Sequence, residues 1–143
     1  MHKVVIFGTR DTAELALWYL TNDSHYTVEA FTVNSEYLTE DTFHGLPVVP
    51  FESIEDKYSP DEYLLFAPMT GVKMNTVRKN IYLEGKLKGY KFASYISSKA
   101  TVCDNKIGEN CFILEDNTLQ PFTTIGNNVD RKSTRLNSSH SSV

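Results

Sequence analysis

Apolar runs alternate with amphipathic segments along the first two thirds of the chain. Five apolar runs predict strands, at Lys3–Gly8, Tyr26–Val33, Leu46–Val49, Glu62–Met69 and Tyr90–Ile96. The run at Glu62–Met69 is continuously apolar, which is typical of a central strand buried on both faces. Strands that alternate with helices in this way indicate a parallel sheet with helices packed on its faces.

Helical periodicity fills the segments between these runs. Four apolar residues share one face of a helix at spacings i, i+3, i+4 and i+7: Ala13, Ala16, Leu17 and Leu20. Asp11, followed three residues later by Glu14, predicts a capping box at the start of this helix. Ser53–Tyr58 predicts one or two helical turns, and a longer helix is expected from about Lys73 to Lys88.

From Ile107 onward the apolar pattern has a period of six. One row is aliphatic and a second row is small or compact: Ile107, Ile113, Leu119 and Ile125, then Cys111, Asn117, Thr123 and Val129. Such a repeat is typical of a parallel β-helix coil, in which short strands meet at tight corners and the aliphatic side chains point to the axis. Corners are predicted at Gly108–Asn110 and Gly126–Asn128, because Gly and Asn tolerate positive φ.

The six-residue period stops at Asp130, and the chain that follows is polar. The letters DRKSTRLNSSH, from Asp130 to His140, are the in-frame translation of a common short-read sequencing adapter. We therefore interpret residues 130–143 as an adapter-derived, disordered tail that packs against nothing, and we exclude it from the fold. The alternative is a genuine basic tail in solvent.

Charge and composition narrow the classes of function. The chain has 14 basic and 18 acidic residues, and without residues 130–143 there remain 11 and 17, a net charge of -6. Because nucleic-acid binding rewards clustered Lys and Arg, we expect no nucleic-acid partner. The apolar runs are too short to span a bilayer and no cleavage signal follows KVVIF, so we expect no membrane partner and a cytoplasmic location. Cys103 and Cys111 indicate neither a zinc site nor a disulfide framework.

Polar residues follow three of the predicted strands, where parallel α/β sheets bind their ligands. Gly8 permits a tight turn before the first helix, whose free amides can hold a phosphate, and Arg10 can contact a diphosphate with its side chain. Asn34 follows the second strand, where nucleotide-binding sheets often bind ribose or base. The loop after Glu62–Met69 offers three more candidates: Thr70, Gly71 and Lys73. Each has a plain alternative as an exposed or turn-forming residue.

Motifs of other chemistries are missing from the sequence. The dinucleotide pattern G-x-G-x-x-G is not satisfied, because Arg10 and Ala13 occupy two of its glycine positions, and this disfavours a nicotinamide-dependent oxidoreductase. His2, His25 and His44 have no paired carboxylate or nucleophile at a recognisable spacing, so surface positions are expected for them. No metal cluster, nucleophile elbow or Walker loop is found, and no metal site is expected.

The order of parts resembles a known family. A small nucleotide-type α/β domain, then YISSKATV (Tyr95–Val102), then KIGENCFILEDNTLQPFTTIGNNV, resembles the bacterial sugar O-acyltransferases of the sialic acid O-acetyltransferase family. The resemblance covers Met1–Val129. It implies an α/β fold in which residues 1–96 form a Rossmann-like parallel sheet that binds a nucleotide sugar. Residues 97–129 are then little more than the first coil of a truncated left-handed parallel β-helix of hexapeptide repeats.

The resemblance also implies an activity. In that family the β-helix trimerises, acetyl-coenzyme A lies between neighbouring β-helices, and a β-helix histidine acts as base on the acceptor amine or hydroxyl. By resemblance, Gly8, Thr9 and Arg10 fall in the first phosphate-binding loop, Asn34 at the second-strand position and Lys73 in the third loop. The implied acceptor is a UDP-linked amino sugar. The first loop departs from the commoner glycine-rich form, which leaves the identity of the sugar nucleotide open.

No catalytic residue is carried over from the family. Its histidine follows shortly after the position of Val129, and His140 belongs to the adapter translation. The chain is therefore expected to be an inactive N-terminal fragment of an acetyl-CoA-dependent sugar O- or N-acetyltransferase. The alternative is a stand-alone nucleotide-binding or regulatory module without catalysis.

Overall fold

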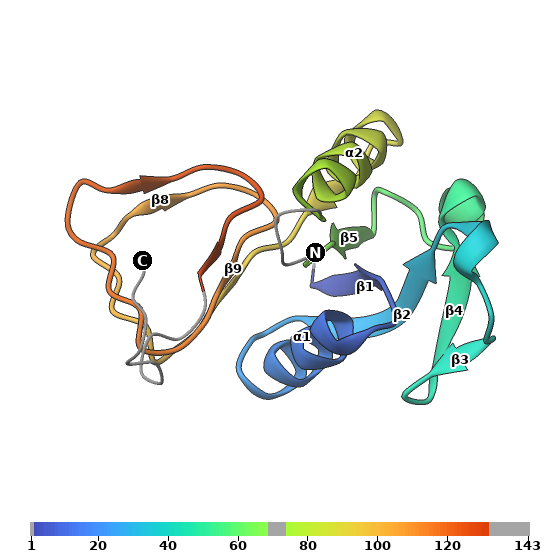
Figure 1. The fold of residues 1–143 in the computed structure, drawn as a ribbon, viewed down its shortest axis with the longest axis horizontal. Coiled ribbons are helices and arrows are strands. Elements are labelled where there is room, and N and C mark those ends of the chain that lie inside the picture. The colour runs from blue at the N-terminus through green and yellow to red at the C-terminus, as the bar shows by residue number, and fades with distance from the viewer. Residues whose placement is uncertain (1, 69–73, 132–143) are drawn as a thin grey trace.

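The computed structural model describes residues 2–68 and 74–131, which form an α/β sheet followed by a triangular coil (Figure 1). The sheet region contains β1 (Lys3–Phe7), α1 (Asp11–Asn22), β2 (Thr27–Val33), η1 (Ser35–Tyr37), β3 (Thr42–Phe43), β4 (Leu46–Pro50), η2 (Phe51–Asp56), β5 (Tyr63–Phe66), α2 (Met74–Leu87) and β6 (Lys91–Phe92). The coil contains β7 (Tyr95–Ile96), β8 (Lys106–Ile107), β9 (Phe112–Ile113), β10 (Thr124–Ile125) and β11 (Asp130–Arg131).

The main sheet has the strand order β3-β4-β2-β1-β5-β6. All of its pairs are parallel except β3 with β4, a short hairpin that the sequence did not predict and that turns at His44 and Gly45, both with positive φ. The chain first runs from β1 outward to β4 and then returns to β5 on the other side of β1. The β1–β5 boundary is therefore the switch point at which sheets of this kind bind ligands.

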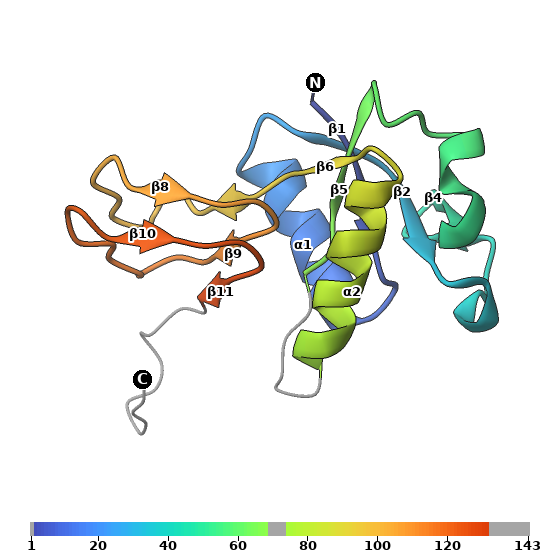
Figure 2. The same ribbon diagram turned by 90° about the horizontal axis from the view of Figure 1, so that it is seen from above.

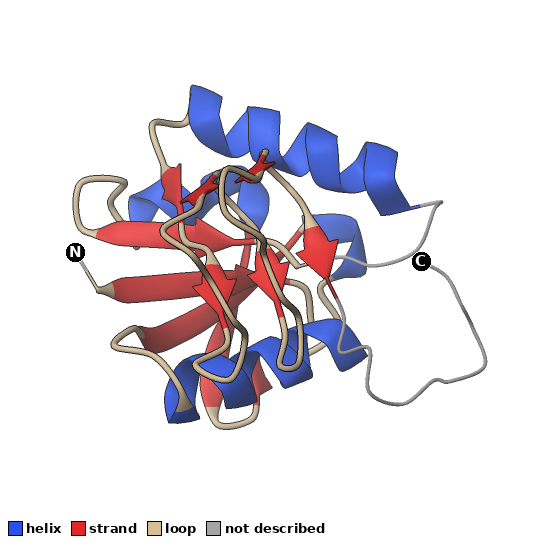
Figure 3. Ribbon diagram, turned by 90° about the vertical axis from the view of Figure 1, so that its left-hand side faces the viewer, coloured by secondary structure: helices blue, strands red, loops and turns tan. Residues whose placement is uncertain are grey.

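Alternating side chains of the central strands pack on opposite faces of the sheet. Val4 and Ile6 of β1 lie in a cluster with α1, whereas Val5 and Phe7 lie in a cluster with α2 and η2. Figure 3 shows α1 and α2 on either side of the sheet. The predicted parallel sheet with helices on its faces is confirmed, because strands buried on both sides require this layering.

The coil is held by parallel pairs between segments one turn apart. Lys106 pairs with Thr124 and Phe112 with Asp130, both 18 residues apart, while Tyr95 pairs with Phe112. Figure 2 shows these short strands lying along one another. No helix crosses residues 113–125, as the six-residue period predicted. The stack β7-β9-β11 amounts to two turns, so the expectation of little more than one coil is wrong.

Corners recur every six residues along the coil. The residues with positive φ there are Asp104, Asn110, Asp116, Phe122 and Asn128. The predicted corner glycines keep negative φ; at Gly108 a Cβ would lie 2.7 Å from the backbone of Gly126, so this glycine permits close stacking of two turns. Phe122 is fully exposed, and a left-handed backbone at such a residue costs about 1–2 kcal/mol.

Both predicted rows face the interior of the coil. Cys111, Ile113, Leu119 and Ile125 form its buried cluster, and Ile107 and Val129 pack against it. A small residue two positions before each aliphatic one leaves room for the aliphatic side chain at the axis, which is why the two rows run in step.

Two predicted boundaries differ from the structure. The segment Tyr90–Ile96 is not one strand: β6 ends at Phe92 in the main sheet, and Tyr95 begins the coil, so the division falls at Ala93–Ser94. Asp130 and Arg131 pair with β9 instead of packing against nothing, because their backbone groups continue the ladder one turn above Phe112 and Ile113. Residues 132–143 lie outside the described part, and the prediction of disorder there stays a prediction.

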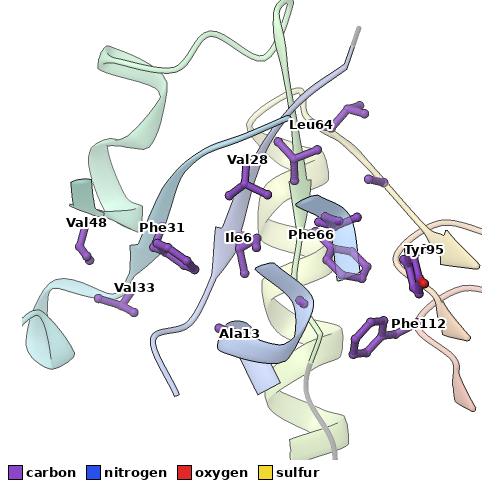
Figure 4. Close-up of a cluster of buried hydrophobic side chains, with 14 of the residues drawn as sticks. Ile6, Ala13, Val28, Phe31, Val33, Val48, Leu64, Phe66, Tyr95 and Phe112 are labelled. Atoms are coloured by element: carbon purple, nitrogen blue, oxygen red, sulfur yellow. The ribbon is translucent and has the colours of Figure 1, made fainter. Parts of the chain in front are cut away.

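Aromatic packing fastens the coil to the end of the sheet. Phe112 of β9 has its ring 5.5 Å from that of Phe66 and 5.8 Å from that of Tyr95, and it also contacts Tyr19 of α1 at 6.0 Å. Figure 4 shows Tyr95 and Phe112 closing one end of the cluster that runs across the sheet from Val48. One apolar core therefore spans both parts of the molecule.

A buried asparagine joins the two parts by hydrogen bonds. Asn110 is fully buried at a corner; its Oδ1 accepts from the Ala67 N–H at 2.8 Å, and its Nδ2 donates to the Ala67 carbonyl at 3.2 Å. The same Nδ2 donates to Oδ1 of Asn128, one turn above, at 2.8 Å. The peptide group at the carboxyl end of β5 is thus satisfied by the coil, since an unpaired buried amide would be costly.

Charged side chains of α2 form a second seam with the coil. Arg78, which is almost fully buried, donates to the carbonyl of Asn110 and pairs with Asp130 at 2.7 Å. Nearer the helix end, the Glu109 carboxylate accepts from the Tyr82 hydroxyl at 2.7 Å and from the Lys86 ammonium at 3.0 Å. These contacts connect α2 to the coil at two corners, and the Arg78–Asp130 pair is the more buried of the two ion pairs.

Replacing Asn110 is expected to be strongly destabilising. Asn110→Ala leaves the buried Ala67 peptide without partners and should lower the free energy of unfolding by about 2–4 kcal/mol, measured by urea titration. Asn110→Gly tolerates the corner φ, so it separates side-chain bonding from backbone strain. The exposed Asn22→Ala is the control. If Asn110→Gly unfolds like the wild type, the Ala67 bonds contribute nothing to stability.

Glu109 is expected to make the coil sensitive to acid. Partial burial raises the pKa of its carboxyl, but hydrogen bonds from the Phe92 N–H, Tyr82 and Lys86 outweigh burial and hold the pKa below its usual 4.5. A carboxyl with a lowered folded-state pKa adds stability above its unfolded pKa and loses it as pH falls through the folded value.

The stability gap between wild type and Glu109→Gln should therefore be full at pH 7 and shrink as the pH falls below about 4.5. Urea midpoints at several pH values measure it. The exposed Glu84→Gln controls for the lost charge. A gap that stays constant down to pH 3 contradicts this role for Glu109.

Candidate functional site

The candidate site lies at the carboxyl edge of the main sheet, where loops after neighbouring strands meet. Gly8 follows β1, Asn34 follows β2 and Glu52 follows β4. The pairing of Phe7 with Thr32 and of Val33 with Pro50 brings these strand ends level with one another. The first two predicted positions, Gly8 and Asn34, are thus brought to one edge of the sheet.

Gly8 turns the chain from β1 into α1. Its N–H donates to the Thr32 carbonyl at 2.8 Å, which extends the ladder by one residue, and its φ of 116° is one that other residues rarely adopt. Ala13 lies next to it, 3.6 Å from where a Cβ would be. The backbone therefore leaves the sheet close to the start of α1, as a ligand-binding turn requires.

The first turn of α1 offers backbone amides at this edge. Arg10 is the N-cap residue in an extended conformation, and within the described part of the chain no side-chain cap hydrogen bond forms there. The predicted capping box is wrong: Asp11 is already the first helical residue, and the Glu14 carboxylate instead pairs with His44 at 2.7 Å. An uncapped helix start has N–H groups directed outward, and these attract anions.

Arg10 has its side chain in solvent. Within the described ranges, its guanidinium makes no hydrogen bond or ion pair, and Thr9 beside it is half-buried. The guanidinium is therefore available to a ligand at the start of α1, and its planar fork suits the paired oxygens of a phosphate.

Asn34 and Glu52 form a second polar group, one and two strands away from Gly8. The Glu52 carboxylate accepts from the Ser35 N–H at 2.9 Å and from Nδ2 of Asn34 at 3.4 Å. Partial burial raises the pKa of the Glu52 carboxyl, but hydrogen bonds from its own backbone, Ser35 and Asn34 outweigh burial and leave the pKa lowered. Glu52 is therefore a carboxylate acceptor at neutral pH.

Three predicted site residues cannot be placed. Thr70, Gly71 and Lys73 lie outside the described residues. The described chain reaches Ala67 and Pro68 at the end of β5 and resumes at Met74 at the start of α2. The assignment of Lys73 to the family's third loop therefore stays a prediction.

No motif or spacing in the sequence singled out Glu52 or the groove between α2 and the coil. Glu52 is one of many acidic residues, and only its position after the paired end of β4 distinguishes it. The groove has a volume of about 470 Å³ between α2 and a coil corner, and it is lined by Arg78, Lys79, Tyr82, Leu83, Asn127 and Asn128. None of the residues that line it belongs to the predicted site.

Several chemistries find no support in the described residues. No group of three His, Cys, Asp or Glu side chains in ranges 2–68 and 74–131 is placed to hold a metal ion. None of the described helices has the length and apolar character needed to cross a bilayer. Residues 95–131 of the coil contain no histidine.

Solved structures share the fold of this chain. The acetyltransferase domain of PglB from Neisseria gonorrhoeae FA1090 aligns with a TM-score of 0.73 and 18% identity over 91% of this chain and 62% of that one. The same domain in complex with acetyl coenzyme A aligns with a TM-score of 0.72 and 18% identity, over 90% of this chain and 60% of that one. PerB from Caulobacter crescentus, in complex with CoA and GDP-perosamine, aligns with a TM-score of 0.75 and 18% identity, over 93% of this chain and 61% of that one.

The likeness is one of fold. Comparison with protein-family models and with curated protein sequences finds no match. The chain spans about three fifths of the length of each of these solved chains. At 18% identity, the TM-scores show that this chain shares the α/β-sheet-plus-coil fold of these solved structures, and they show the fold alone.

Proposed function

We propose that the chain binds a nucleotide-linked amino sugar as the acceptor for acetyl transfer from acetyl-coenzyme A. The proposal rests on the carboxyl edge of the sheet, where the glycine turn, the start of α1 and the exposed Arg10 follow one another. This group of donors suits a diphosphate. The shared fold with PglB and PerB, whose structures contain acetyl coenzyme A or CoA with GDP-perosamine, favours a sugar acetyltransferase.

The order of the strands gives the acceptor a direction. Figure 1 shows β2 and β4 on one side of β1 and the coil on the other, so a ligand with its diphosphate at the β1–β5 switch point would have one end over β2 and β4 and the other over β5 and the coil. The polar pair Asn34 and Glu52 suits a nucleoside, so the sugar extends toward the coil. The acceptor nitrogen or oxygen then lies on the coil side, where the family places its chemistry.

The transfer itself needs parts outside the described residues. The acceptor nitrogen or oxygen attacks the thioester carbonyl, the C–S bond breaks, and a general base takes the acceptor proton while the thiolate leaves. The described coil has no histidine for this step, so we assign the base to no residue here. We further propose a left-handed coil of hexapeptide repeats that forms a trimer, with the acetyl donor between neighbouring coils.

Arg10→Ala should weaken nucleotide-sugar binding without unfolding the protein. A charge-assisted contact to phosphate is worth roughly 1.5–3 kcal/mol, so the dissociation constant should rise about ten- to a hundredfold. The urea midpoint should stay unchanged, because Arg10 is exposed and makes no described contact. Calorimetric titration with GDP- and UDP-linked sugars measures the affinity.

Lys3→Ala is the matched control. It removes one positive charge at the amino end of β1, whereas Arg10 lies beyond the carboxyl end of that strand. It should leave the affinity unchanged. Tight binding of NAD with no response to any sugar nucleotide would overturn the proposed function. Equal losses in Arg10→Ala and Lys3→Ala would mean that net charge, and not a site at the α1 start, attracts the ligand.

A further inference from the structure

We propose that the nucleobase of the acceptor is guanine, recognised by the carboxylate of Glu52. This inference rests on the proposed function and specifies its ligand. The base must lie at the far end of the nucleotide from the sugar, hence beyond β2 and over the end of β4. The pairing of Val33 with Pro50 puts Glu52 at this place, next to Asn34.

The Glu52 carboxylate is held in a fixed orientation. One oxygen accepts from the Ser35 N–H at 2.9 Å, and the other accepts from the Asn34 amide at 3.4 Å. A carboxylate has about four lone-pair sites, so each oxygen keeps a further one for a ligand. Because Glu52 is exposed, those sites face solvent at the sheet edge.

No described cation neutralises Glu52. Lys88 approaches it but donates to the Glu52 main-chain carbonyl at 3.3 Å, while its ion pair is with Glu55 at 3.0 Å. Across residues 2–68 and 74–131, no ion pair to the Glu52 carboxylate is formed. The edge where the base would lie therefore presents a negative acceptor and selects for hydrogen-bond donors.

Guanine is the base that offers two adjacent donors. Its N1–H and its N2 amino group are side by side and match the two oxygens of a carboxylate. Uracil presents one N–H between two carbonyl oxygens, and a carboxylate repels these oxygens. Adenine presents an amino group next to an acceptor nitrogen, so only one of its two groups can donate to a carboxylate. The same carboxylate thus attracts one base and rejects the others, which is how specificity usually arises.

Asn34 has a complementary and less selective task. Its amide nitrogen faces Glu52, so its oxygen is left to accept from a ribose hydroxyl. Every ribonucleotide offers that hydroxyl, so Asn34 adds affinity without choosing the base. The guanine assignment therefore depends on Glu52 alone, and it replaces the uridine that the sequence resemblance implied.

The test is calorimetric titration of the 143-residue chain with GDP, UDP and ADP. GDP should bind at least about tenfold more tightly than UDP or ADP, as expected for charge-assisted bonds at an exposed site. Glu52→Gln should reduce this preference to about threefold or less, chiefly through weaker GDP binding. Glu55→Gln removes the same charge three residues away and should leave the preference intact.

Each other outcome overturns the inference in a distinguishable way. UDP binding as tightly as GDP refutes the guanine assignment while leaving the proposed function standing. A GDP preference that survives in Glu52→Gln, with unchanged circular dichroism, shows that another group recognises the base. Failure of all three nucleotides to bind the folded wild type overturns the proposed function together with this inference.

Discussion

The bond pair between Asn110 and the Ala67 peptide joins the two halves of the molecule. Ala67 follows β5, the strand beside the switch point, and it is fully buried. Its N–H and carbonyl need partners, and the coil supplies both through one side chain. Asn suits this position twice over, since it tolerates the corner φ of 58° and carries both a donor and an acceptor. Around this contact, Phe112 packs against Phe66, and Arg78 donates to the Asn110 carbonyl.

This docking sets the direction of the proposed ligand. The coil lies beyond β5 in the strand order, and β2 and β4 lie on the side of the sheet away from it (Figure 1). In the proposed binding mode, the base therefore lies over β2 and β4 and the sugar points to the coil. The hydrogen bonds between Asn110 and Ala67 hold the coil beside the end of β5.

The sequence predicted the layered sheet and the six-residue coil because both follow from burial of apolar residues at regular spacing. It mispredicted features that tertiary contacts decide. The apolar run Tyr90–Ile96 predicted one strand. Tyr95 instead belongs to the coil, because its backbone pairs with Phe112 and its hydroxyl donates a hydrogen bond to the Asp23 carboxylate. The predicted capping box does not form, because the Glu14 carboxylate pairs with the imidazole of His44, thirty residues away along the chain.

The candidate site was predictable in part. Gly8 and Arg10 could be found because a glycine after an apolar run marks the first strand-to-helix turn. Glu52 could not be found, since its role depends on the register between β2 and β4, which a single sequence does not reveal. Asp130 was assigned to the tail by its codon match, yet the backbone ladder and the contact with Arg78 include it in the coil.

The proposed function requires a nucleotide sugar to lie across the carboxyl edge with its sugar toward the coil. Diffraction from crystals soaked with a GDP-linked hexose would locate the ligand. We expect density for the base beside Glu52, for the diphosphate at the Gly8 turn with Arg10 in contact, and for the hexose on the β5 side. Density with the opposite orientation, or confined to the groove between α2 and Asn128, would contradict it.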